Sequence, residues 1–123
     1  MTYAQRMSRR MSPMSEKPWL RVLDAARKVV DDINQLLKRG RLPNAVQLRD
    51  AAESITGNIQ EGFGRNRGPD RNQFLRFARA SAEETNEHLR ARFAARDLPE
   101  KIYWPIHHRL VAIVRMLTSL MTK

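Results

Sequence analysis

The sequence predicts an all-α protein, folded as an antiparallel up-down-up-down four-helix bundle. Four segments repeat apolar residues at alternating spacings of three and four, which places them on one face of a helix. Breaks of roughly three to six residues separate these segments, and connections this short favour antiparallel neighbours. No stretch alternates apolar and polar residues as a strand does. At 123 residues, the chain is expected to form a single domain with its own core.

The first helix is expected at about residues 18–39, and Gly40 and Pro43 end it. Its inward line keeps the three-four spacing and comprises Leu23, Ala26, Val30, Ile33 and Leu37. A second apolar stripe with seven-residue spacing runs beside this line and comprises Val22, Val29 and Leu36. The apolar face is therefore wider than a single core seam needs.

The second helix is expected at about residues 44–63, where Asn44 and Gln47 have the spacing of a capping box. Its inward line comprises Leu48, Ala52, Ile55, Ile59 and Phe63. Gly62 and Gly64 are expected to end the helix. Gly57 lies in its interior, where glycine costs roughly 1 kcal/mol relative to alanine. Ser54, Gly57 and Asn58 therefore indicate either a close helix crossing or a tolerated glycine.

The third helix is expected at about residues 69–96 and the fourth at about 99–121. Pro69 and Asp70 suit a first helical turn, and Asp97 with Glu100 has capping-box spacing before the fourth helix. The inward line of the fourth helix comprises Tyr103, Ile106, Leu110, Ile113, Leu117 and Leu120. Pro105 predicts a bend or a late start there.

Charge and composition narrow the class of protein. The chain has 23 basic and 13 acidic residues, a net charge of +10, which makes a polyanion the natural partner. The excess lies in residues 1–41 and 99–123, so the first and last helices are expected to form one basic face. No cysteine is present, and no apolar run is long enough for a membrane span. Residues 1–17 are interpreted as a flexible basic arm without a secretory signal, and a cytoplasmic location is expected.

Enzymatic chemistry is not predicted. His107 and His108 are adjacent and point about 100° apart on a helix, so they cannot share a metal ion by themselves. His88 completes the histidines, and neither a metal nor another cofactor is expected. No nucleophile with a base and an orienting partner stands out. Trp19, Tyr103 and Trp104 are candidates for stacking on bases, or else pack at helix ends.

The loop GFGRNRG joins the second and third helices. It acts as a helix stop and turn, and it also offers phosphate contacts through Arg65 and Arg67, with Arg71 from the start of the third helix. The remaining candidate phosphate contacts are the basic residues Arg6, Arg9, Arg10, Arg21, Arg27 and Lys28. Polar residues beside the seams of the second and third helices predict a structural polar network of Asn58, Glu61, Ser81 and Glu84.

The middle of the chain resembles the bacterial four-helix bundle proteins encoded by intervening sequences in 23S ribosomal RNA genes. Their wider group includes the accessory variability determinant proteins of diversity-generating retroelements. The matching residues are Gln47 to Arg49, Ala52, Ser54, Ile55, Asn58, Ile59, Glu61 to Arg65, Phe74 to Arg79, Ser81, Glu84, His88 and Leu89. The chain departs from the pattern at Ala80, where the family usually has glycine, and at Ala82, where it often has leucine.

The resemblance implies a homo-oligomer, typically a pentamer, that is not an enzyme. It also implies nucleic-acid binding, with a reverse transcriptase as a possible protein partner for the retroelement relatives. Val22, Val29 and Leu36 fit an oligomer interface. The leading hypothesis is therefore a non-enzymatic oligomeric bundle that binds RNA or DNA through phosphates. The alternative is a protein–protein scaffold without direct nucleic-acid binding.

Overall fold

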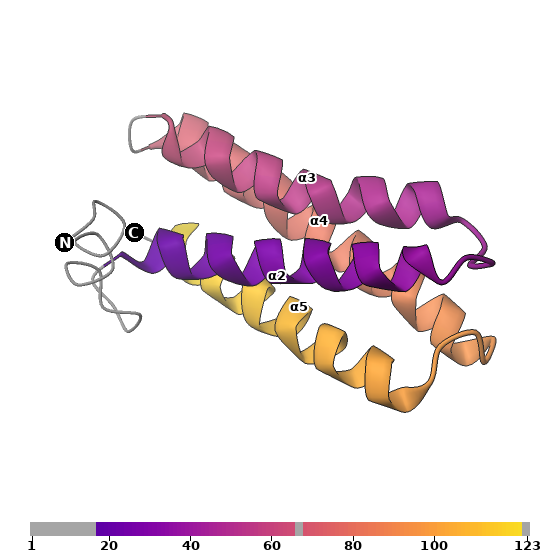
Figure 1. The fold of residues 1–123 in the computed structure, drawn as a ribbon. Helices are drawn as coiled ribbons and strands as arrows, with labels where there is room; N and C mark the ends of the chain where they lie inside the picture. Colours follow the sequence, from indigo (N-terminus) through magenta and orange to yellow (C-terminus); the bar gives the residue numbers. More distant parts are fainter. Residues whose placement is uncertain (1–16, 66–67, 122–123) are drawn as a thin grey trace, which may run out of the picture.

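The structure, a computed structural model, describes residues 17–65 and 68–121. Within these ranges it contains four helices and no strand: α2 (Pro18–Lys38), α3 (Ala45–Phe63), α4 (Pro69–Ala94) and α5 (Glu100–Met121). Successive helices run in opposite directions, and the start of α2 lies at the same end of the bundle as the end of α5 (Figure 1). The predicted all-α four-helix bundle is confirmed.

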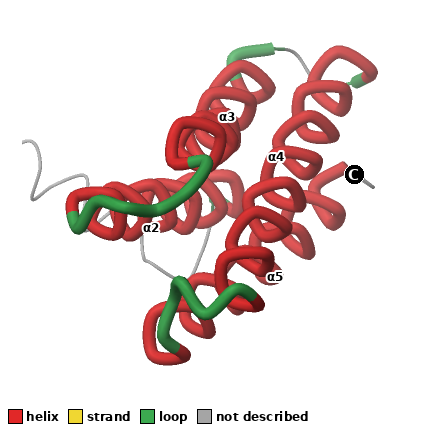
Figure 2. Tube along the Cα trace, turned by 90° about the vertical axis from the view of Figure 1, so that its right-hand side faces the viewer, coloured by secondary structure: helices red, strands yellow, loops and turns green. Residues whose placement is uncertain are grey.

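Each helix packs against two neighbours, which gives the bundle a closed order. Helices adjacent in sequence pack together, and α2 closes the bundle against α5. The α3–α4 contact is the most extensive and the α2–α5 contact the least. Figure 2 shows α3 beside α4, with α2 and α5 completing the arrangement. The first and last helices are therefore neighbours, as the sequence predicts.

The apolar stripe of α2 lies in the core of the single chain. Val22 and Val29 are 0% exposed and Leu36 is 7% exposed. The prediction that these three side chains form an outer oligomer interface is therefore wrong. Because α2 packs against α3 on one flank and α5 on the other, its buried face must be wider than one seam. Val30 and Leu37, expected on the inward line, are only half-buried.

The predicted caps differ from those in the structure. Asn44 has left-handed backbone angles (φ 60°) and makes no side-chain cap bond, so the Asn44–Gln47 capping box is wrong. The Asp97 carboxylate accepts a bond of 2.9 Å from Arg92 Nη1, which anchors the end of α4. Helix α5 starts at Glu100 and continues through Pro105, so the expected late start at the proline is also wrong.

The close approach between α3 and α4 lies at Gly62 and not at Gly57. A Cβ added to Gly57 would have no neighbour within 4 Å, so the close-crossing interpretation at that residue is wrong. A Cβ on Gly62 would lie 3.2 Å from Phe74 Cβ and 3.4 Å from the Arg71 carbonyl oxygen. Gly62 thus lets the end of α3 approach the backbone of α4 at the start of that helix.

Candidate nucleic-acid interface

Arg71 fastens the corner between α3 and α4. Its Nε donates to the Gly62 carbonyl at 3.2 Å, and its Nη2 donates to the Arg65 carbonyl at 2.7 Å. The guanidinium also lies 4.9 Å from the centroid of the Phe63 ring. The Gly62 carbonyl also accepts from the Arg65 N–H at 3.2 Å, so Arg71 adds a side-chain donor there and supplies one to the Arg65 carbonyl just beyond α3. The side chain predicted as a phosphate contact is therefore engaged in a structural role.

Arg65 lies at the same corner and has weaker partners. Its Nη2 is 3.7 Å from Glu61 Oε2, and its guanidinium carbon is 5.0 Å from the centroid of the Phe74 ring. Both partners of the ion pair are exposed, and pairs of this kind contribute little to stability. Arg65 can therefore turn to another anion at small cost. Arg67 and the arm residues Arg6, Arg9 and Arg10 lie outside the described residues.

The predicted contacts on α2 are exposed. Lys28 Nζ lies 3.3 Å from Asp32 Oδ1, an ion pair within one helical turn. The side chains of Arg21 and Arg27 are exposed and make no ion pair or hydrogen bond with the part of the chain that the structure describes. Their guanidinium groups are consequently available to an external anion.

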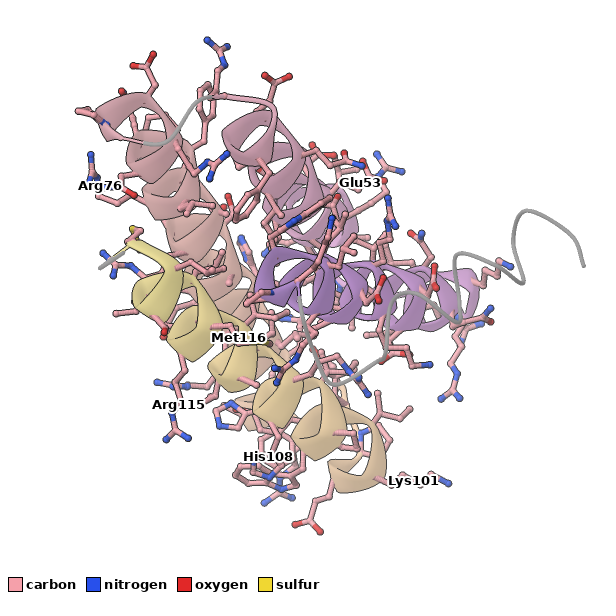
Figure 3. All side chains as sticks on the ribbon, turned by 90° about the vertical axis from the view of Figure 1, so that its left-hand side faces the viewer. Glu53, Arg76, Lys101, His108, Arg115 and Met116 are labelled. Carbon is pink, nitrogen blue, oxygen red and sulfur yellow. The ribbon has the colours of Figure 1, made fainter. Side chains whose placement is uncertain are left out.

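Further exposed cations were not selected from the sequence. Figure 3 shows Lys101, His108 and Arg115 projecting from α5, and Arg76 projecting from α4. The side chains of Lys101, Arg115 and Arg76 also make no ion pair or hydrogen bond within residues 17–65 and 68–121. The concentration of positive charge in residues 99–123 was the sequence signal that could have identified the two on α5.

The helices divide into two pairs of different charge. Together α2 and α5 contain seven lysine and arginine residues against four acidic residues. The pair α3 and α4 contains six against seven. Because α2 and α5 are neighbours, their cationic excess lies on one side of the bundle.

The predicted polar network is present in part. Ser81 Oγ on α4 donates to Ser54 Oγ on α3 at 2.9 Å, and Asn58 Nδ2 donates to Ser54 Oγ at 3.0 Å. Glu61 is exposed and faces Arg65, and Glu84 is exposed, so the prediction that they belong to this network is wrong. Ser54 is the hydroxyl that joins the other two residues, and the sequence prediction did not include it in the network.

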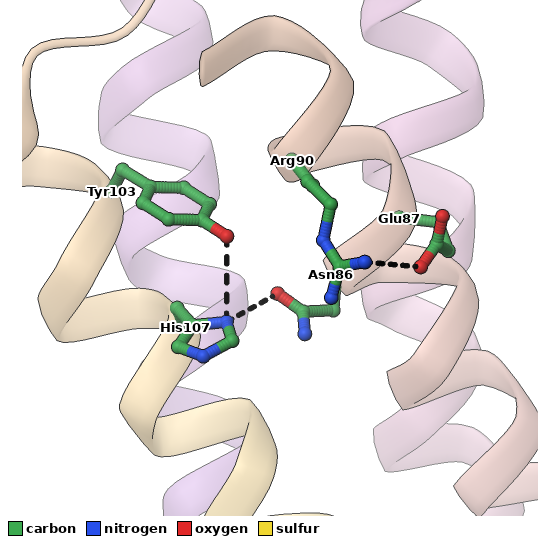
Figure 4. A network of polar contacts seen from close by, with 5 residues as sticks. All are labelled: Asn86, Glu87, Arg90, Tyr103 and His107. Atoms are coloured by element: carbon green, nitrogen blue, oxygen red, sulfur yellow. Dashed lines mark hydrogen bonds and ion pairs between the residues drawn. The ribbon is translucent and has the colours of Figure 1, made fainter. Parts of the chain in front are cut away.

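A second polar cluster joins α4 and α5 around His107 (Figure 4). His107 Nδ1 lies 3.1 Å from Asn86 Oδ1 and 3.5 Å from the Tyr103 hydroxyl. Since Asn86 Oδ1 accepts, this contact fits the tautomer that carries its proton on Nδ1. Burial, followed by the positive charges of His108 and Arg90, lowers the pKa of His107 below 6.5. Both effects favour the neutral ring, which can serve as a structural donor between the two helices.

The aromatic candidates for base stacking have different environments. The Trp19 ring stacks on Phe63 at 5.3 Å, and the buried Tyr103 ring stacks on Phe93 at 4.2 Å. Both rings therefore pack within the bundle. Trp104 remains 43% exposed, beside His108.

Neither a metal site nor a membrane span is found within the described ranges. No group of three histidine, aspartate or glutamate residues there could hold a metal ion. None of the described helices is long and apolar enough to cross a membrane.

Comparison with known proteins identifies relatives of this bundle. Residues 18–119 match the family described as 23S rRNA-intervening sequence protein. A crystal structure from Bacteroides thetaiotaomicron, of a protein with unknown function from the S23 ribosomal protein family, has the same fold with a TM-score of 0.80. The two chains are 20% identical, and the match covers 87% of this chain and 100% of the other. A comparison with functionally curated proteins gave no match.

Proposed function

Because the chain belongs to the 23S rRNA-intervening sequence protein family, we propose that it is a non-enzymatic bundle that binds RNA or DNA through phosphate contacts. The observation that carries the proposal is the cationic excess on the neighbouring helices α2 and α5. Arg21, Arg27 and Lys101 on this side have no ion pair within the described ranges that a phosphate would need to displace. Phosphate neutralisation by such side chains releases counterions and provides affinity without reading sequence.

Salt dependence tests this proposal directly. Fluorescence anisotropy would measure binding of labelled structured RNA and duplex DNA over a series of salt concentrations. Because each neutralised duplex phosphate contributes about −0.9 to the slope of log K against log salt, the double variant Arg21→Glu/Arg27→Glu should make the slope less negative by about 2. Affinity that is independent of salt would reject the proposal.

A matched control separates local contacts from the general effect of charge. Arg49 on α3 is exposed, and its Nε lies 3.7 Å from the carboxylate of Asp50 beside it. The variant Arg49→Glu removes the same charge per residue from the side without a cationic excess. It should leave the salt slope within experimental error. An equal change in salt slope per replaced arginine in this control would mean that binding depends on net charge and not on the α2–α5 side.

A second candidate function is assembly through exposed apolar side chains. Val46, Phe77 and Trp104 are 55%, 46% and 43% exposed and lie on three different helices. Such residues suit contacts with further copies, up to the pentamer that the family resemblance implies, or with a protein such as a reverse transcriptase. Light scattering tests self-assembly. A monomer for the native chain, or an unchanged oligomer in Phe77→Ser and in Trp104→Ser, would reject assembly through these residues.

A further inference from the structure

A groove separates α2 and α5 near the end of α2 and the start of α5. Its volume is about 270 Å³. This is slightly below the range of drug-sized pockets, which start at about 300 Å³, so the groove suits a single small ligand and not several consecutive nucleotides. Between these two helices the contact is the least extensive in the bundle, which leaves room for the groove. It is on the side that carries the cationic excess.

The lining of the groove changes in character along its length. Its apolar lining includes Leu36 from α2 and Ile102 and Ile106 from α5. Leu36 and Ile106 are buried and held in place by the core, and the half-buried Ile102 beside them leaves apolar surface on which a flat ring can pack. A carboxylate, an amide and two cationic side chains surround this apolar floor, and most of them come from α2.

The polar side chains of the groove differ in charge between its two ends. Asp32 and Gln35 line one part of the groove, and Arg39 lies beyond them, with Lys101 from α5. Asp32 and Arg39 are separated by seven steps along the helix, or about 10 Å at the rise of an α-helix. Because α5 runs antiparallel to α2, its first turn, which contains Lys101, lies at the Arg39 end. The groove thus has a carboxylate and an amide at one end and two cations at the other.

The Asp32 carboxylate keeps capacity for a ligand. Lys28 Nζ lies 3.3 Å from Oδ1, and Arg109 Nε lies 4.0 Å from Oδ2, beyond hydrogen-bond distance. Arg109 Nε is buried and has no hydrogen-bond partner within the described residues. A carboxylate offers about four acceptor positions, so two adjacent donors of a ligand can be accommodated beside these cations.

We propose that this groove binds one unpaired guanine nucleotide. The base packs on the apolar floor and presents its adjacent N1–H and N2–H donors to Asp32, while its phosphate lies between Arg39 and Lys101. Guanine is the base that offers a carboxylate two neighbouring donors on one edge, and unstacked bases are the elements of RNA that proteins read. The inference rests on the proposed function, because it assigns a nucleotide subsite to the nucleic-acid-binding side.

Nuclear magnetic resonance of the ¹⁵N-labelled full chain tests the subsite. The protein would be titrated with GMP, AMP, CMP and UMP, and with guanosine and inorganic phosphate as separate probes. GMP should shift the amides of residues 35–39 and 101–106 saturably, and more tightly than the other nucleotides. Guanosine should bind the same residues more weakly. Absence of saturable shifts in these residues, or equal affinity for all four nucleotides, would overturn the inference.

Substitutions test which end of the groove holds the phosphate and which holds the base. Lys101→Ala should weaken GMP binding by about tenfold, as expected for loss of one hydrogen bond to a charged group, and leave guanosine binding unchanged. Asp32→Asn should remove the preference for GMP over AMP. If Asp32→Asn loses the native spectrum, Gln35→Ala tests the same end of the groove at an exposed residue and should weaken GMP binding. The control Arg49→Ala alters an exposed α3 cation that does not line the groove, and its GMP affinity should stay within about twofold.

Two further arms distinguish a free nucleotide from a nucleotide within a polymer. A uridine hexamer with one guanosine should bind more tightly than a hexamer of uridine alone, and Asp32→Asn should remove the difference. Equal binding of the two hexamers by the native chain would overturn the subsite within RNA. If GMP binds in the groove while polymers show no salt-dependent binding, the proposed function fails and the subsite stands. If polymers bind with a steep salt slope but without a preference for guanine, the guanine subsite fails and the proposed function stands.

Discussion

Two alanine substitutions in α3 test where the helices approach each other. Gly57→Ala and Gly62→Ala make the same chemical change in the same helix, five residues apart. Their effects on the unfolded chain are therefore similar and cancel in the comparison. The difference between the two variants reports the space around each glycine in the folded protein.

The structure predicts opposite outcomes. At Gly57 the new methyl group has no neighbour within 4 Å, so the variant should gain the helix propensity of alanine, about 1 kcal/mol. At Gly62 the methyl group would meet Phe74 Cβ at 3.2 Å, Leu75 Cδ2 at 3.3 Å and the Arg71 carbonyl oxygen at 3.4 Å. Two of these atoms move only with the backbone of α4. Overpacking of this kind costs about 1–3 kcal/mol, which offsets or exceeds the propensity gain.

Urea denaturation followed by circular dichroism measures both changes. Gly57→Ala should raise the free energy of unfolding by about 1 kcal/mol and the melting temperature by roughly 4 °C. Gly62→Ala should change it by between about 0 and −2 kcal/mol. Equal stabilisation of the two variants would refute the close approach at Gly62. A destabilised Gly57→Ala would refute the open space at Gly57 and point to a contact with another chain there.

Three other substitutions follow from the contacts described above. Arg71→Ala should lower the free energy of unfolding by about 1–3 kcal/mol, because the Gly62 carbonyl and the Phe63 ring lose a charged partner. The exposed control Arg76→Ala should change it by less than about 0.5 kcal/mol. Equal effects of the two variants in urea denaturation would contradict the structural role of Arg71. Val29→Glu should unfold the chain and not merely separate it from other copies, because a carboxylate would replace a side chain that is 0% exposed. A folded monomeric variant, seen by circular dichroism and light scattering, would instead show that Val29 lies at an interface between chains. Because the pKa of His107 in the folded chain lies below the ordinary 6.5, the unfolded state binds more protons in the window beneath 6.5, so stability should fall as pH decreases through that window. His107→Gln should make the free energy of unfolding depend less on pH, as measured by urea denaturation at a series of pH values. An unchanged pH dependence would show that His107 is not its cause.

The helices were predictable because their signals are local. A three-four apolar spacing commits a segment to one buried face, and glycine or proline marks its end. The predicted inward line of the last helix contains Ile106, Leu110, Ile113 and Leu117, all of which are buried in the structure. The adjacency of the first and last helices also followed, because short connections leave few ways to close four helices.

The candidate site was only partly predictable. Arg21 and Arg27 were recognised from charge alone and are exposed, but Arg71 looked the same in the sequence. Its guanidinium is engaged because the turn between α3 and α4 presents two backbone carbonyls to it. No spacing rule distinguishes an arginine that fastens a corner from an arginine that faces solvent.

The sequence by itself determined four amphipathic helices, their order and the sign of the charge at each end of the chain. Only the tertiary structure decided that Val22, Val29 and Leu36 lie in the core, since the width of a buried face depends on how many neighbours a helix touches. It also decided that side chains from the segments 32–39 and 101–106 line one groove. Periodicity records which side of a helix avoids water, whereas the pairing of distant side chains depends on the register and spacing of helices that meet only in the folded chain.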